Sequence, residues 1–137
     1  MTENIFRQQQ KVLFKHCDPA GIMFYPRYFE IINDCVEAFF DAIGHAFEDL
    51  HKSASVPTAK IETEFLRPSR HGDMLDLALH CTRVGRASAG FSIVATCAGE
   101  TRLTFRSVIV HIALDGAPTP WPDDLRAAIT AYRADAG

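Results

Sequence analysis

Residues 26–44 read PRYFEIINDCVEAFFDAIG and hold the one long helical pattern of the chain. Apolar residues recur there at spacings of three and four, which is typical of a buried helical stripe. The stripe consists of Tyr28, Ile32, Cys35, Val36, Phe39 and Ile43, and it is widened by Phe29, Ile31 and Phe40. Pro26 suits the first turn, where its missing N–H is not needed, and Gly44 suits the helix end. Because this helix is apolar on most sides, we expect a second layer to wrap around it.

The sequence predicts that layer from Val56 to Leu114, where apolar and polar residues alternate with a period of two. The alternating series are Ile61, Thr63, Phe65; Leu75, Leu77, Leu79, Cys81; Ala89, Phe91, Ile93, Ala95, Cys97; and Leu103, Phe105, Ser107, Ile109. Turn-forming residues separate these series at 68–72, 85–88 and 99–100. Consecutive strands with short breaks favour an antiparallel sheet, and a twisted sheet curled around one apolar helix satisfies both patterns.

Two further elements complete the predicted fold. The segment Ile5–Phe14 ends in Val12-Leu13-Phe14, which we interpret as a first strand. Residues 120–124 precede a short final helix that carries Leu125, Ile129 and Tyr132. The expected fold class is α+β, with an antiparallel sheet of about five strands wrapped around one long central helix and a short C-terminal helix. We expect residues 1–137 to form one domain.

The composition narrows the class of function. The 137 residues are 47% apolar and carry a formal net charge of -3, which argues against disorder and against nucleic acid as the main partner. No apolar stretch approaches the length of a membrane span, and the N-terminus lacks the layout of a signal peptide. We therefore expect a cytoplasmic protein without a membrane partner. The cysteines and histidines show no metal-ligand spacing and no glycine-rich phosphate loop is present, so we expect neither a metal nor a cofactor.

The loop before the helix, HCDPAGIMFYP at residues 16–26, is where we expect the chemistry. Asp18 precedes a constrained turn in which Pro19 fixes its own φ and Gly21 can take a positive φ. The first N–H groups of the following helix have no partners inside the helix and can stabilise an oxyanion. A carboxylate close to such a helix start suits acyl transfer. On spacing alone the alternative is an Asx-turn, in which Asp18 only caps a local N–H.

The same loop resembles the signature of the 4-hydroxybenzoyl-CoA thioesterase family, through Cys17-Asp18-Pro19-Ala20-Gly21-Ile22 and Phe24-Tyr25-Pro26-Arg27-Tyr28. A second stretch, Phe65-Leu66-Arg67-Pro68 leading to Gly72-Asp73, is similar to the turn between the second and third strands of that family. The resemblance runs from about Gln8 to Leu125. It implies the hotdog fold, in which an antiparallel sheet wraps a central helix.

The resemblance also implies roles for particular residues. Asp18 would act as nucleophile or general base on the thioester, and the backbone N–H of Tyr25 would polarise the thioester carbonyl. Phe24 would line the acyl pocket, with Gly21 in the same substrate-binding loop. The partner is then an acyl-CoA, in which coenzyme A belongs to the substrate. Because relatives combine these elements across a subunit interface, the resemblance further implies a homo-oligomer, either a dimer or a homotetramer.

Two neighbours of Asp18 allow more than one interpretation. Many relatives have an acidic residue where this chain has His16. Alternation along an extended segment would place His16 on the face of Asp18. There it would favour the charged carboxylate, serve as a second base, or simply point away. Cys17 is either a nucleophile or, more commonly for its residue type, a small buried side chain.

Three residues further along the chain are candidate substrate contacts. Asn33 shares a helix face with Phe29 and either offers its amide to the acyl pocket or faces solvent. Arg83 and Arg86 flank the turn at Gly85, where they either border the phosphates of coenzyme A or are merely solvated.

The leading interpretation is a thioesterase that acts on aromatic or short-to-medium acyl-CoA. A first alternative is a hotdog dehydratase or hydratase, which would need a paired histidine and acid for proton transfer on the acyl chain. A second alternative is an acyl-CoA binding module without catalysis. The intact Asp18 and Gly21 favour the hydrolase.

Overall fold

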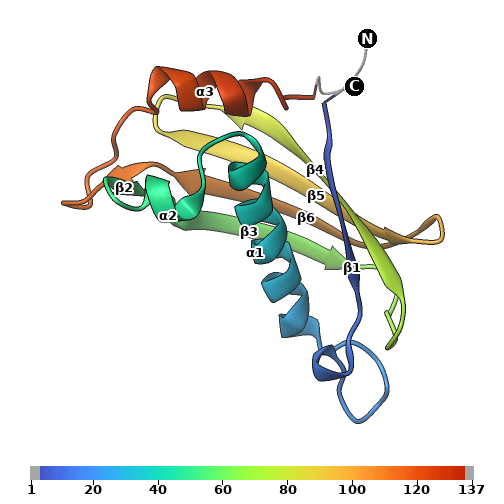
Figure 1. Ribbon diagram of the computed structural model, residues 1–137. Coiled ribbons are helices and arrows are strands. Elements are labelled where there is room, and N and C mark those ends of the chain that lie inside the picture. The colour runs from blue at the N-terminus through green and yellow to red at the C-terminus, as the bar shows by residue number, and fades with distance from the viewer. Residues whose placement is uncertain (1–3, 135–137) are drawn as a thin grey trace.

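The computed structural model describes residues 4–134, which form a curved five-stranded antiparallel sheet around one long helix (Figure 1). The strands of this sheet are β1 (Phe6–Lys11), β3 (Thr58–Phe65), β4 (Met74–Val84), β5 (Ser88–Cys97) and β6 (Glu100–Val110), in the order β1-β4-β5-β6-β3. A small second sheet pairs β2 (Ala54–Ser55) with β7 (Ile112–Ala113). The helices are α1 (Tyr25–Ala42), α2 (Phe47–Leu50) and α3 (Asp123–Thr130), and a 3-10 turn covers Phe14–His16. The predicted α+β hotdog fold is confirmed.

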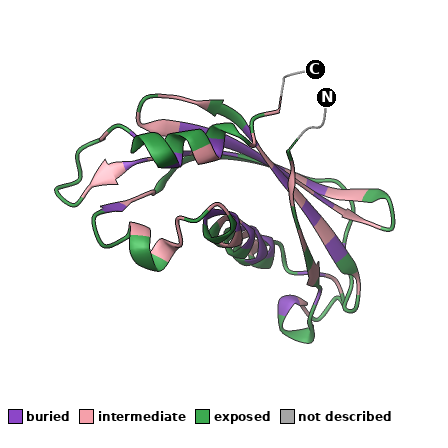
Figure 2. Ribbon diagram, turned by 45° about the horizontal axis from the view of Figure 1, so that its top comes forward, coloured by how far each residue is buried: buried purple, intermediate pink, exposed green. Residues whose placement is uncertain are grey.

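The core lies between α1 and the concave face of the sheet. Figure 2 shows α1 almost end-on beneath the sheet, with buried residues on the helix side that faces the strands. Buried residues of α1 are Tyr28, Ile31, Ile32, Cys35, Phe39 and Phe40. Of these, Phe39 and Phe40 are completely buried and stack edge-on against Phe91 of β5. Burying such a ring contributes roughly 1.5–3 kcal/mol, so this contact stabilises the packing of α1 against the sheet.

The ends of the two predicted helices follow the residues that suggested them. Pro26 lies in the first turn of α1, and Gly44 follows the last turn with a φ of +87°, a conformation that glycine adopts without strain. In α3, Leu125 and Ile129 are buried against the sheet, and the Tyr132 carbonyl after the helix accepts the Cys81 N–H of β4 at 2.9 Å. No helix within residues 4–134 is both long and apolar enough to cross a bilayer.

The first strand differs from the prediction. We placed it at residues 12–14, but β1 ends at Lys11 and Phe14 opens the 3-10 turn. The Val12 N–H still donates to the Asp73 carbonyl in register with β4, but the Leu13 N–H donates to the His16 ring, so the pairing with β4 ends there. Phe14 is consequently 81% exposed.

The edge strand β3 has an apolar face that stays uncovered. Alternation predicted that Ile61, Thr63 and Phe65 would face the core, and they do lie on the face that looks toward α1. However, Ile61 and Phe65 remain 49% and 46% exposed. Ile61 lines a groove of about 400 Å³ between β3, β6 and α1, and Phe65 lines a separate, smaller hollow at the start of α1. Among the described strands, β3 pairs only with β6 and leaves its other edge open.

Candidate active site

Asp18 occupies the first position of a tight turn. The Gly21 N–H donates to the Asp18 carbonyl at 2.9 Å, and the Asp18 N–H donates to the Ile22 carbonyl at 2.9 Å. Asp, Pro and Gly stand at the first, second and fourth positions, as a type I turn prefers, and Gly21 has a φ of +81°. Asp18 Oδ1 accepts the Ala20 N–H at 2.9 Å. The Asx-turn alternative therefore describes one oxygen of Asp18, while the other has no protein partner among the described residues.

The start of α1 presents one available backbone donor. Phe24 precedes the helix in an extended conformation, and its N–H donates to the His16 carbonyl. Pro26 has no N–H, and the Arg27 N–H donates to the Phe24 carbonyl at 2.9 Å. Within the described part of the chain, the Tyr25 N–H is left without an acceptor. It therefore combines an unsatisfied hydrogen with the positive end of the helix dipole.

A short hairpin connects the Asp18 turn to the Tyr25 N–H at the start of α1. Asp18 lies opposite Ile22, Cys17 pairs with Met23, and the next rung joins His16 to Phe24. Two rungs at ~3.3 Å per residue separate the levels of Asp18 and Phe24 by about 7 Å of backbone, and Tyr25 follows Phe24. The Asp18 turn and the first N–H of α1 are therefore held in one small hairpin.

Of the alternatives for His16, the structure supports a ring that is held by its own turn. His16 ends the 3-10 turn, and its buried ring accepts the Leu13 N–H on Nδ1 at 2.9 Å. Burial, with a contribution from the Lys15 charge, lowers the pKa of His16. A neutral ring held in this way stabilises the turn. The Cys17 thiol points back to the Leu13 carbonyl at 3.7 Å.

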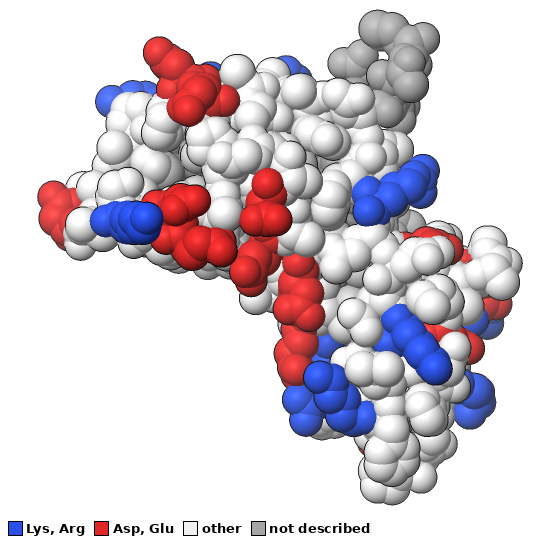
Figure 3. All heavy atoms as spheres, viewed as in Figure 1, with Lys and Arg blue, Asp and Glu red and all other residues white. Residues whose placement is uncertain are grey.

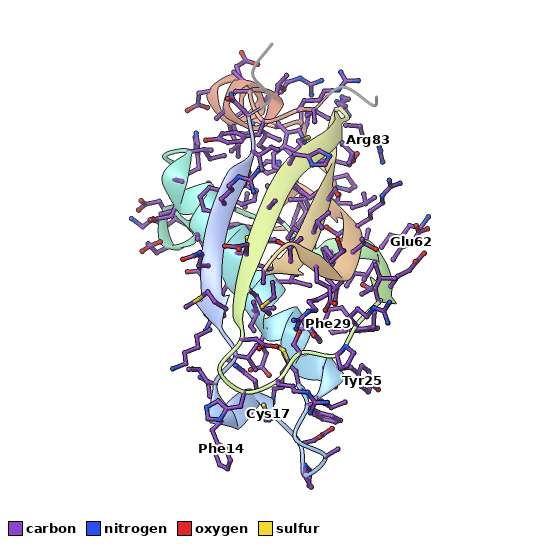
Figure 4. All side chains as sticks on the ribbon, turned by 90° about the vertical axis from the view of Figure 1, so that its right-hand side faces the viewer. Phe14, Cys17, Tyr25, Phe29, Glu62 and Arg83 are labelled. Atoms are coloured by element: carbon purple, nitrogen blue, oxygen red, sulfur yellow. The ribbon has the colours of Figure 1, made fainter. Side chains whose placement is uncertain are left out.

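Aromatic side chains line a hollow of about 240 Å³ at the start of α1. Tyr25 and Tyr28 of α1 pack against Phe65 of β3, with ring centroids 5.9 and 5.7 Å apart. Phe24 is exposed and packs edge-on against Tyr25 at 5.6 Å. In Figure 4, Tyr25 and Phe29 lie on the same side of the molecule, with Cys17 below them. The sequence predicted Phe65 as a strand residue only, because its contact with α1 spans about 40 residues of chain.

The larger groove begins where this hollow ends. Phe29 contacts Phe65 at 6.3 Å and Phe105 at 6.4 Å between ring centroids, so aromatic rings separate the two spaces. Asn33 lines the groove beyond them and is itself exposed to solvent, so it combines the two predicted alternatives. His51 also lines it, and its Nδ1 lies 2.8 Å from the Phe47 carbonyl.

Arg83 and Arg86, the two predicted arginines, lie at the end of the sheet that is far from Asp18. Asp73, next to the start of β4, contacts the loop region, whereas Arg83 is close to the end of that strand, nine residues beyond Met74. At ~3.3 Å per residue this separates Arg83 from the Asp18 end by roughly 30 Å. Arg83 lines a shallow hollow with Lys60 and Arg106, on the sheet face away from α1. Arg86 is exposed nearby, so one chain does not bring either arginine to Asp18.

The remaining charge distribution also restricts where a polyanion can bind. Figure 3 shows acidic side chains in a stripe over α1 and α2. Asp34, Glu37, Asp41 and Glu48 border this outer surface, which therefore repels phosphate groups. Within residues 4–134, no group of three or more His, Cys, Asp or Glu side chains is arranged to hold a metal ion.

The curved antiparallel sheet around one central helix, together with the Asp18 turn just before that helix, defines the class of this protein. It is a hotdog-fold protein of the thioesterase class. Residues 12–129 match the thioesterase-like superfamily, and the chain belongs to this family. The sequence-level resemblance is thus confirmed for the superfamily as a whole.

Solved structures show the same fold at low sequence identity. A 1,4-dihydroxy-2-naphthoyl-CoA thioesterase from Synechocystis superposes with a TM-score of 0.86 at 17% identity, covering 93% of this chain and 96% of that one. A gentisyl-coenzyme A thioesterase gives 0.82 at 20% identity, covering 90% and 98%. A Staphylococcus aureus protein solved in complex with CoA gives 0.90 at 18% identity, covering 96% and 85%.

Among curated proteins, a 1,4-dihydroxy-2-naphthoyl-CoA hydrolase of Synechococcus elongatus is 27% identical over 84 residues. The match covers 59% of this chain and 62% of the relative, so the two are similar over somewhat less than two-thirds of the relative's length.

Proposed function

We propose that this protein is an acyl-CoA thioesterase in which Asp18 attacks the thioester, directly or through water, while the Tyr25 N–H holds the carbonyl oxygen. The observation that carries the proposal is the hairpin, which holds in one short loop a carboxylate with an unpaired oxygen, at Asp18, and an unpaired helix-start N–H, at Tyr25. A basic oxygen and an oxyanion donor are the two groups that acyl transfer needs.

Two routes fit this geometry. In the general-base route, Asp18 takes a proton from water as the water oxygen bonds to the thioester carbon. The carbonyl electrons move to the oxygen that Tyr25 holds, and collapse expels the CoA thiolate, which takes up the proton. In the nucleophilic route, a carboxylate oxygen bonds to the same carbon and CoA leaves. Water then cleaves the resulting anhydride.

The acyl group in this proposal is aromatic or medium-sized. Tyr25, Tyr28, Phe29 and Phe65 form an aromatic wall beside the helix start. Such faces stack well on planar groups, and the named relatives act on naphthoyl- and gentisyl-CoA. In this proposal Asn33, which lines the groove, gives a hydrogen bond to a polar substituent that reaches it.

We further propose that the active form is a homo-oligomer, either a dimer or a pair of dimers. The open β3 edge and the uncovered Ile61 and Phe65 are features that a second subunit would cover. The roughly 30 Å between Asp18 and Arg83 means that Arg83 can only contact a CoA bound near Asp18 if that Asp18 belongs to another subunit.

The test is thiol release from a panel of acyl-CoA thioesters, with wild type compared with Asp18→Asn. Asn can still accept the Ala20 N–H, so the turn and acyl-CoA binding should be retained while the carboxylate is lost. We expect kcat to fall by far more than tenfold. A variant that keeps more than a tenth of wild-type kcat would have lost less than ~1.4 kcal/mol, which is too little for the principal catalyst.

A further inference from the structure

The turn between β3 and β4 is joined by buried hydrogen bonds to the loop that carries Asp18. Ser69, in the middle of this turn, is completely buried, and its carbonyl accepts the Met23 N–H at 2.7 Å. Arg70 pairs with Ile22 in an isolated bridge. Since Ile22 in turn accepts the Asp18 N–H, the position of Ser69 determines where the Asp18 hairpin lies.

The same serine also anchors the start of α1. The Tyr28 hydroxyl, one turn into the helix, lies 2.7 Å from Ser69 Oγ and is buried with it. Burial raises the pKa of the Tyr28 phenol, so this group stays a neutral hydrogen-bonding partner. Ser69 therefore contacts both segments that carry the proposed site, at Met23 in the Asp18 hairpin through its carbonyl and at Tyr28 in the first turns of α1 through its hydroxyl.

Arg102 of β6 fixes Ser69 from behind. Its Nη1 donates to Asp73 Oδ2 at 2.8 Å, to Ser69 Oγ at 3.1 Å and to the Pro68 carbonyl at 3.2 Å. Asp73 Oδ2 also accepts the Arg70 N–H at 2.9 Å, which closes the turn. The hydrogen bond from Arg102, with help from the Arg70 N–H, lowers the pKa of Asp73, so the ion pair stays charged at neutral pH.

We propose that Arg102, together with Asp73, is a positioning residue for the thioesterase reaction: it acts through Ser69 to set the spacing between Asp18 and the Tyr25 N–H. Arg102 itself does not touch the thioester. The inference rests on the proposed function. It also gives a role to the Pro68 and Gly72-Asp73 motif, which no catalytic step uses.

The experiment compares Arg102→Met with Glu100→Gln in the full-length protein. Glu100 makes an ion-pair contact of 2.7 Å with Arg102 Nε from the exposed side, so its replacement leaves the contacts to Ser69 in place. We expect Arg102→Met to lower kcat at least tenfold while KM for the best acyl-CoA changes less than threefold. Glu100→Gln should stay within twofold of wild type in both constants.

Two more variants keep the test decisive if Arg102→Met does not fold. Arg102→Lys keeps the charge, but a single ammonium group cannot reproduce the planar guanidinium contacts, so kcat should be intermediate. Ser69→Ala keeps the carbonyl and removes only the hydroxyl, and should also lower kcat more than it changes KM.

Unchanged kcat in the folded Arg102 variants, or equal losses in Arg102→Met and Glu100→Gln, would overturn the positioning role while leaving the thioesterase in place. A rise in KM with normal kcat would overturn it as well, because spacing of the reacting groups affects the chemical step. A wild-type protein without turnover on any acyl-CoA would instead overturn the proposed function, and this role with it.

Discussion

At the residue scale, we propose that Tyr25 contributes to the chemical step through its backbone, whereas its ring belongs to the aromatic wall. Its N–H is the proposed oxyanion donor, and proline is the one substitution that removes this hydrogen. Phe24 has φ −70° and ψ +123°, a conformation that a residue before proline can adopt, and the first helical position accepts proline. Tyr25→Pro should therefore fold and lower kcat by about 10²-fold or more, as loss of one oxyanion donor does elsewhere.

The matched control is Tyr25→Ala, which removes the ring and keeps the N–H. Thiol-release assays should show a much larger kcat for Tyr25→Ala than for Tyr25→Pro. If kcat falls by the same factor in both variants, the loss comes from the ring and not from the N–H, contrary to the proposed mechanism.

His16 should make the stability of the protein dependent on pH. Its pKa is lowered in the folded state, so as pH falls below about 6.5 the unfolded chain takes up a proton that the folded chain resists. The free energy of unfolding should be highest above that pH and fall toward pH 5. His16→Asn keeps an acceptor for the Leu13 N–H but does not titrate, and should flatten the decrease in urea denaturation. Equal slopes for both proteins would exclude this role.

The sequence predicted single residues best where the reason was local. Gly21 has the positive φ that the Asp-Pro-Ala-Gly turn required. The 3-10 turn at Phe14–His16 was not predicted, because an apolar run such as Val12-Leu13-Phe14 is equally typical of the end of a strand. The links from Arg102 to Ser69 were missed because alternation along β6 says nothing about a turn that lies 33 residues away.

At the element scale, α1 and β3 together determine the space for the acyl group. Phe65 separates the hollow near Tyr25 from the groove that contains Asn33, and its ring packs against Tyr25, Tyr28 and Phe29. Phe65→Ala should join the two spaces and favour longer acyl groups. Two additional buried methylene groups contribute ~1.6 kcal/mol, so kcat/KM for long relative to short acyl-CoA should rise about tenfold.

Phe65→Trp should shift the preference the opposite way, toward short acyl groups. Met74→Ala is the control, because Met74 is similarly exposed at 44% and lines neither space. An acyl-length profile that Phe65→Ala leaves unchanged would show that Phe65 does not separate two parts of the acyl site.

The periodic patterns predicted these elements well because both α1 and the central strands are buried on one side. The inward residues of β4 and β5 and the stripe of α1 lie largely where the spacing put them. The pattern could not show that β3 remains uncovered. Alternation identifies the apolar face of a strand, whereas the presence of a neighbour on that face is decided by the path of α1.

At the scale of the whole molecule, the edge of β3 that faces away from β6 has no pairing strand among the described residues. The Leu66 N–H donates to the Arg102 carbonyl on β6, and hydrogen-bonding direction alternates along a strand. The Thr63 N–H, three residues earlier, therefore points away from β6 toward the open edge. Thr63 Oγ1 is buried and has no partner among the described residues.

We expect light scattering at micromolar concentration to show a dimer or tetramer, and we expect Thr63→Pro to shift it to monomer. Proline at this position removes an edge N–H without breaking the ladder to β6, because proline is tolerated where the N–H of an edge strand faces outward. Thr63→Val keeps that N–H and removes the unpartnered hydroxyl, so it should remain an oligomer with wild-type activity.

If subunits complete the acyl site for each other, Thr63→Pro should lose thioesterase activity together with the oligomer. A folded Thr63→Pro monomer with full activity would show that one chain holds a complete site.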